Sequence, residues 1–135
     1  MARIPYITDA QAGESELVQA IKSRRGGSLA ALDRLLLHSH PIAQGWAPLM
    51  GRIRDDLAVS AKWREFAMCA VAVLNGAEYE WVHHAPLFLA AGGREDQLAA
   101  LRQLRPDPER ALTKAVFDAD ERAMLRFVVE STLSV

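Results

Sequence analysis

Residues 61–92 decide the fold, and they read AKWREFAMCAVAVLNGAEYEWVHHAPLFLAAG. The segment from Ala61 to Leu74 is apolar on all sides, which is typical of a helix at the centre of a core. Ser60 precedes it as an N-cap, and Gly76 can adopt the left-handed conformation that ends a helix. A second helix is expected from Ala77 to Ala91. Because only a short Asn-Gly turn joins the two, they are expected to pack as antiparallel neighbours.

The rest of the chain follows the same helical periodicity. Strict alternation of apolar and polar residues is absent, so no strand is predicted. An irregular arm is expected over residues 1–13. The pattern predicts an all-α fold, one bundle of about six to seven helices formed as a single domain over residues 1–135. Besides the two central helices, helices are expected over residues 14–22, 28–37, 41–57, 95–104 and 119–133.

Local signals set several of these boundaries. Ser28 is the expected N-cap of one helix, and Pro41 is suited to the first turn of the next. Asp118 and Glu121 form a capping-box pattern before the last helix. Pro86 lies inside the second central helix, where it frees a backbone carbonyl and is expected to kink the helix beside the two histidines.

Composition narrows the classes of function. The chain has 135 residues, half of them hydrophobic and about a quarter charged, with a net charge of -1. No basic stripe points to nucleic acid, and no apolar run reaches the roughly 20 residues that a membrane span needs. The N-terminus has no apolar signal-peptide core, so a cytoplasmic protein is expected. Cys69 is the single cysteine, which rules out an intramolecular disulfide and a Cys-x-x-Cys site.

The second central helix carries the residues that are most suggestive of chemistry. Glu80 and His84 are four residues apart and therefore share one helical face. Glu65, on the first central helix, is a carboxylate in apolar surroundings, which is costly unless it is paired. Antiparallel packing could bring Glu65 toward Glu80 and His84. Two carboxylates beside one imidazole can divide the roles of acid and base near neutral pH.

Other interpretations of these residues stay open. Pairs spaced i,i+4 are common helix stabilisers, so Glu80 and His84 could be purely structural. The spacing matches no zinc signature, and no metal or other cofactor is predicted. Cys69 is expected to be a small core residue. His83 is expected on a different face of its helix, where it could lie at a subunit contact.

Residues 64–92 resemble the core of the carboxymuconolactone decarboxylase family, which includes the alkylhydroperoxidase D-like proteins. The flanking stretches agree with the resemblance: LLLHSHPIAQGW at residues 35–46 and REDQLAAL at residues 94–101. Together they cover about two-thirds of the chain. The resemblance implies an all-helical fold of the alkylhydroperoxidase D-like type, usually assembled as trimers or hexamers.

The peroxidase branch of that family carries a Glu, then Cys-x-x-Cys-x-x-x-His. Laid on this chain, the Glu falls on Glu65 and the His on His84. The first cysteine position falls on Ala77 and the second on Glu80, so both thiols are missing. Thiol peroxidase chemistry needs an attacking and a resolving cysteine, and Cys69 is out of register with both.

The decarboxylase branch lacks the cysteine pair, and this chain looks more like it. In that branch, polar and acid–base groups act around a lactone acid. The resemblance implies His84 as proton donor, with Glu65 orienting or recharging it and Glu80 tuning its proton affinity. Arg64 is the nearest basic group for a substrate carboxylate, and His83 is a weaker candidate for substrate binding.

Related proteins continue with another helical segment after the last helix seen here, so the C-terminal part of this chain is expected to be shortened. An incomplete helical layer would expose apolar surface and favour a homo-oligomer. Three functions therefore stand side by side: a cofactor-independent lyase-like enzyme on a small carboxylated lactone or related acid, a non-catalytic oligomeric family member, and a thiol peroxidase that would need an intermolecular thiol. No nucleic-acid or membrane partner is expected.

Overall fold

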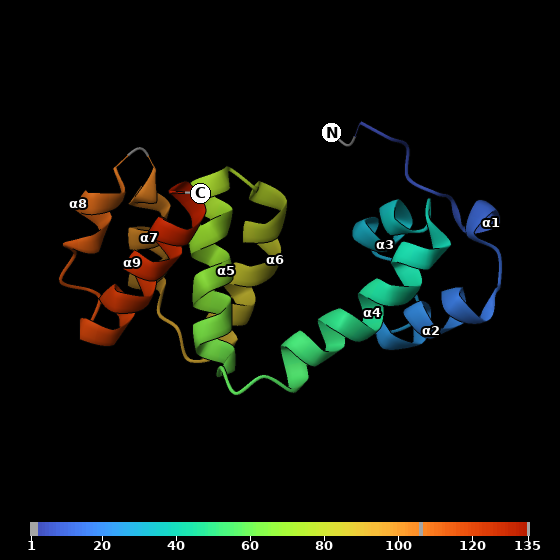
Figure 1. Ribbon diagram of the computed structural model, residues 1–135, viewed down its shortest axis with the longest axis horizontal. Helices are drawn as coiled ribbons and strands as arrows, with labels where there is room; N and C mark the ends of the chain where they lie inside the picture. Colours follow the sequence, from blue (N-terminus) through green and yellow to red (C-terminus); the bar gives the residue numbers. More distant parts are fainter. Residues whose placement is uncertain (1–2, 106, 135) are drawn as a thin grey trace. The chain divides into compact units, whose positions relative to one another are not determined.

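The computed structural model describes residues 3–105 and 107–134, and within them every regular element is a helix. The predicted all-α fold is therefore confirmed. Packing divides the chain into two compact units, Met1–Leu57 and Ala58–Val135 (Figure 1). The expectation of a single domain over residues 1–135 stays a prediction. None of the described helices is both long and apolar enough to cross a bilayer.

The first unit contains α1 (Asp9–Ala12), α2 (Glu16–Arg24), α3 (Ala31–Leu36) and α4 (His40–Asp55). Its small core is built from one side of each helix and the loops between them, because the apolar residues recur at helical spacing. The buried members of this core are Ala12, Val18, Ile21, Leu29, Leu37 and Ala43. Pro41 lies in the first turn of α4, as predicted.

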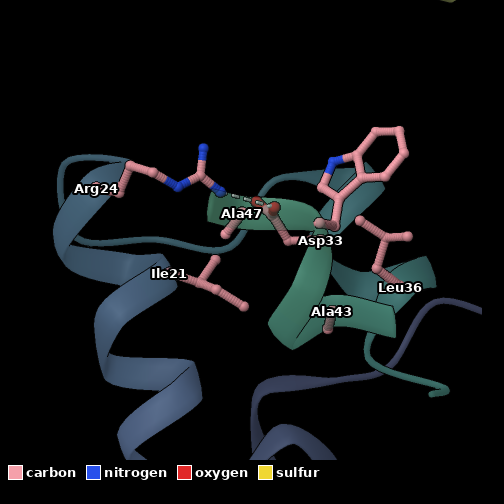
Figure 2. Close-up of a pocket in the computed structure, with 7 residues that line it drawn as sticks. Ile21, Arg24, Asp33, Leu36, Ala43 and Ala47 are labelled. Atoms are coloured by element: carbon pink, nitrogen blue, oxygen red, sulfur yellow. Dashed lines mark hydrogen bonds and ion pairs between the residues drawn. The ribbon is translucent and has the colours of Figure 1, made fainter. Parts of the chain in front are cut away.

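A buried carboxylate fixes the start of α3. Asp33 accepts a hydrogen bond from the Ala30 backbone N–H at 3.0 Å and pairs with Arg25 at 3.0 Å. Arg24 approaches the same carboxylate at 3.5 Å. Figure 2 shows the side chains of Arg24 and Asp33 pointing toward each other. The prediction of Ser28 as the N-cap is therefore wrong, because Asp33 reaches back to cap the helix at Ala30 instead. The crevice around these residues has no room for a water-sized sphere.

The N-terminal arm is more ordered than expected. Within the predicted irregular stretch, whose first two residues lie outside the described part, Thr8 and Gln11 form a capping box that starts α1. Arg34 donates to the backbone carbonyl of Ile7 at 2.9 Å, and His38 donates from Nε2 to that of Pro5 at 2.8 Å. These contacts tie the arm to the segment that begins with α3.

The second unit contains α5 (Ala61–Asn75), α6 (Glu78–Ala90), α7 (Glu95–Leu101), the 3-10 helix η1 (Arg102–Leu104), α8 (Pro108–Leu112) and α9 (Ala119–Leu133). Helix α5 packs against α6 and α9, as its apolar circumference predicts (Figure 1). Three phenyl rings mark the core: Phe66 lies with its ring centroid 5.7 Å from those of Phe88 and Phe117. Packed aromatic pairs of this kind stabilise a core beyond their buried area.

The turn between α5 and α6 forms as the sequence predicts. The Ser60 hydroxyl accepts from the Trp63 backbone N–H, and Gly76 closes α5 with φ 66° and ψ 28°. That left-handed conformation favours glycine because it has no Cβ. At the far end of α6, a Cβ on Gly93 would lie 2.3 Å from the Phe88 ring, so glycine is needed there for close packing. A side chain is therefore disfavoured at both positions, at Gly76 by the backbone conformation and at Gly93 by the Phe88 ring.

Beyond α6 the predictions hold in part. Helix α9 has the predicted bounds and capping box, with Glu121 N–H donating to Asp118 at 2.8 Å. The helix expected over residues 95–104 is present as α7 followed by η1. Helix α8 was not predicted: Asp107 caps it and Pro108 begins it, a pattern that the neighbouring prolines make easy to read as a loop.

Candidate functional site

The packing of α5 against α6 brings Glu65 and His84 into direct contact. His84 Nδ1 lies 2.6 Å from Glu65 Oε2, across 19 residues of sequence. Both side chains are largely buried, with exposed fractions of 8% for Glu65 and 14% for His84. A short hydrogen bond between an imidazole and a carboxylate in such surroundings holds the ring in one orientation.

This contact assigns the hydrogens of the imidazole. An ionised carboxylate only accepts hydrogen bonds, so Nδ1 of His84 is the donor to Glu65. Nε2 then remains for acid–base exchange, and it lies 3.5 Å from Oε2 of Glu80. The Glu80 side chain is 48% exposed. The imidazole is therefore held between an inner carboxylate and an outer one that meets solvent.

Arg64 adjoins the inner carboxylate. Its Nε lies 3.5 Å from Oε1 of Glu65, and its side chain is mostly buried. The guanidinium and the imidazole thus approach different oxygens of the same carboxylate. The structure thus brings together four of the five residues singled out in the sequence: Arg64, Glu65, Glu80 and His84.

The sequence profile of the carboxymuconolactone decarboxylase family matches residues 41–122, which is more than half of the chain and contains all four of these residues. The chain belongs to the carboxymuconolactone decarboxylase family. No curated protein and no solved structure gave a significant match.

His83 of this family member does not join the cluster. Its Nδ1 donates to the backbone carbonyl of Tyr79 at 2.7 Å, and its ring stacks on the Tyr79 ring with centroids 4.3 Å apart. Both side chains are exposed. The adjacent histidines of α6 are therefore in different surroundings: His84 is held against Glu65, whereas His83 stays on the exposed face.

Cys69 lies one turn after Glu65 on α5 and is fully buried. Burial and the nearby charge of Glu65 raise the pKa of the Cys69 thiol to about 12, against a smaller opposing effect of Arg102. A thiol with such a pKa is protonated at neutral pH and is a poor nucleophile. Nothing in this arrangement resembles the low-pKa cysteine that peroxide reduction requires.

A second buried carboxylate, Glu121, lies in the same unit, and its cluster of partners was not predicted. Glu121 accepts from Lys62 Nζ at 2.9 Å and from Gln97 Nε2 at 2.7 Å. Burial acts to raise the pKa of Glu121, but the hydrogen bonds that it accepts outweigh burial, and the pKa is lowered. The partners lie 59 and 24 residues away in sequence, so no local spacing could have revealed them.

Within the described residues, no group of three or more His, Cys, Asp and Glu side chains is arranged to hold a metal ion. The geometry of Glu65, Glu80 and His84 instead suits proton exchange, because each carboxylate faces a different nitrogen of the same ring.

Proposed function

We propose that this family member is a cofactor-independent, lyase-like acid–base enzyme that acts on a small carboxylated lactone or a related acid. The observation that supports this most is the 2.6 Å contact between Glu65 and His84, which leaves Nε2 of a nearly buried imidazole for proton transfer. Family membership supports the same class of chemistry.

The proposed reaction is decarboxylation. The bond between the ring carbon and the carboxylate breaks, carbon dioxide leaves, and the electron pair moves into the system conjugated with the lactone carbonyl. Protonated His84 then delivers the proton on Nε2 to carbon, and Glu65 stabilises the charged ring through Nδ1. Glu80, being exposed, would return a proton from solvent to Nε2 for the next turnover.

Arg64 is the proposed partner of the substrate carboxylate. Its guanidinium lies beside Glu65 and could direct the substrate toward His84. Guanidinium groups bind planar carboxylates well because their donors form a fork. His83 is the weaker candidate for this role, since its ring nitrogen Nδ1 is engaged with Tyr79.

The test is a screen of carboxylated lactones and aromatic-degradation acids, followed by NMR for loss of the carboxyl group. We expect turnover by the parent protein, with a loss of about 100-fold or more in kcat for His84→Ala, the range for a removed general acid. Glu65→Gln should also lower kcat, because its neutral amide no longer stabilises the charged imidazole.

His83→Ala is the matched control, since it removes an adjacent imidazole from the same helix. It should leave kcat within about twofold of the parent if His84 alone moves the proton. Equal activity of the parent and His84→Ala on a converted substrate would refute the proposal.

A second candidate is a non-catalytic homo-oligomer. Exposed apolar side chains on α6 and α9 favour it, namely Val82, Leu87, Phe127 and Leu133. Large apolar side chains left exposed in this way are typical of surfaces that pack against another chain. Light scattering at micromolar concentration should give a mass above 14.9 kDa; a monomeric mass would contradict assembly. Assembly without turnover in the screen would favour this candidate over the enzyme.

A further inference from the structure

A groove between α6 and α7 lies apart from the acid–base cluster. Its volume is about 430 Å³, and small-molecule sites commonly measure about 300–1,000 Å³. None of Glu65, Glu80 and His84 lines it. Its apolar walls are formed by Trp81, Ala85, Pro86, Leu89, Leu98 and Ala99.

Arg102 lies at one end of the groove, and Glu78 neutralises its positive charge. Arg102 donates to both carboxylate oxygens of Glu78, at 2.7 and 2.8 Å. Its guanidinium also lies 4.0 Å from the centroid of the Trp81 ring. Two hydrogen bonds and a cation–π contact hold this side chain in place, and its charge is balanced by Glu78.

The other end carries an unbalanced charge. Glu95, exposed at the start of α7, lines the groove and forms no ion pair with any residue in the described part of the chain. It precedes Arg102 by seven residues, about 10 Å along a helix. The groove therefore offers an apolar surface of that length with a single negative charge at one end.

We propose that this groove binds a small molecule in which an apolar body, such as a phenyl ring with a short alkyl chain, ends in one amine. The body would cover the apolar walls beside Trp81, and the ammonium group would pair with Glu95. An anionic end group finds no equivalent, because Glu78 already neutralises Arg102. This inference does not depend on the proposed acid–base function, since the two sites share no residue.

The probe pair is 4-phenylbutylamine and 5-phenylpentanoate, which share the phenyl ring and the four-carbon chain and differ in the charged end. Binding is followed by the indole N–H signals of the ¹⁵N-labelled full chain, which has three tryptophans. Trp81→Phe assigns the relevant signal. We expect a saturable shift of the Trp81 signal with the amine, and binding of the acid that is at least about twofold weaker, within the range for one exposed charge pair.

Two variants separate the contributions. Glu95→Gln should weaken amine binding about two- to fivefold and remove the preference over the acid. Ala99→Phe should fill the groove and weaken both probes; because Ala99 is exposed, the variant should keep the parent's circular dichroism spectrum. His84→Ala should bind the amine as the parent does, even if its turnover is lost.

Three results would overturn the inference. The first is the absence of a saturable Trp81 shift up to millimolar amine. The second is loss of amine binding in His84→Ala, which would move the ligand to the acid–base cluster. The third is a Trp81 shift that depends on protein concentration without any probe, which would make the groove an interface between copies of the chain.

Discussion

The second unit buries two carboxylates, Glu65 and Glu121, and their partners differ in kind. Glu121 is 1% exposed and accepts hydrogen bonds from an ammonium group, an amide side chain and a backbone N–H. Glu65, 6% exposed when the whole residue is counted, is held against an imidazole, with a guanidinium beside it. Both carboxylates are satisfied, as buried charges must be.

The difference lies in what the partners can do near neutral pH. The donors to Glu121 keep their hydrogens, so its network is fixed and connects α5, α7 and α9. The partner of Glu65 is a histidine, the side chain that gains or loses a proton most readily in this range. Burial of a carboxylate is therefore not in itself a sign of catalysis; a titratable partner with a second, accessible nitrogen is the more telling feature.

The largest expected effect is on stability at Glu121. Glu121→Ala should lower the free energy of unfolding by about 2–4 kcal/mol, because it leaves the buried Gln97 amide without its acceptor and removes the capping box of α9. Urea unfolding followed by circular dichroism measures this directly. A loss below about 1 kcal/mol would mean that the network contributes little.

Glu65→Gln should have a smaller effect on stability and a larger one on chemistry. The amide can still accept from His84 but loses the ionic component of a hydrogen bond to a charged group, so we expect a cost of about 1.5–3 kcal/mol in the same assay. If Glu65→Gln proved more destabilising than Glu121→Ala, Glu65 would be the structural carboxylate and the comparison would reverse.

Lowering the pH should destabilise the protein through protonation of Glu121. Its folded-state pKa is lowered from 4.5, so its contribution to stability is fully present above that value and is lost as pH falls through the lowered pKa. The Tm of the parent should therefore fall between about pH 5 and pH 3 more steeply than that of Glu121→Gln, which has no carboxyl group there to protonate. Parallel Tm curves for the two proteins would argue against a lowered pKa.

The parts of the fold that the sequence predicts are those set by local signals. Ser60, Gly76 and the Asp118–Glu121 box define α5 and α9, and the short turn after Asn75 anticipates the contact of Glu65 with His84. The errors have non-local causes. Asp33 moves the start of α3 because Arg24 and Arg25, nine and eight residues earlier, support it.

The same contrast between local signals and non-local contacts applies to the candidate site, the Glu121 cluster and the groove. A helical face predicts the pair of Glu80 and His84, since both residues lie on one element. The role of Glu121 depends instead on Lys62 and Gln97, which come from two other helices. The groove likewise depends on Arg102 lying over Trp81, a contact between η1 and α6 that no spacing rule describes.

The smallest expected effect is that of Cys69→Ala, which tests whether the thiol beside Glu65 has any part in chemistry. Removing one buried sulfur should cost about 1 kcal/mol, comparable to deleting a methyl group from a core. Turnover of any substrate found in the screen should stay within about twofold of the parent, because a thiol with a pKa of about 12 is neither nucleophile nor base at neutral pH. Iodoacetamide should correspondingly label native Cys69 far more slowly than the unfolded chain. Rapid labelling, or a loss of turnover as large as that of His84→Ala, would show that the thiol is accessible and would place it in the chemistry of the site.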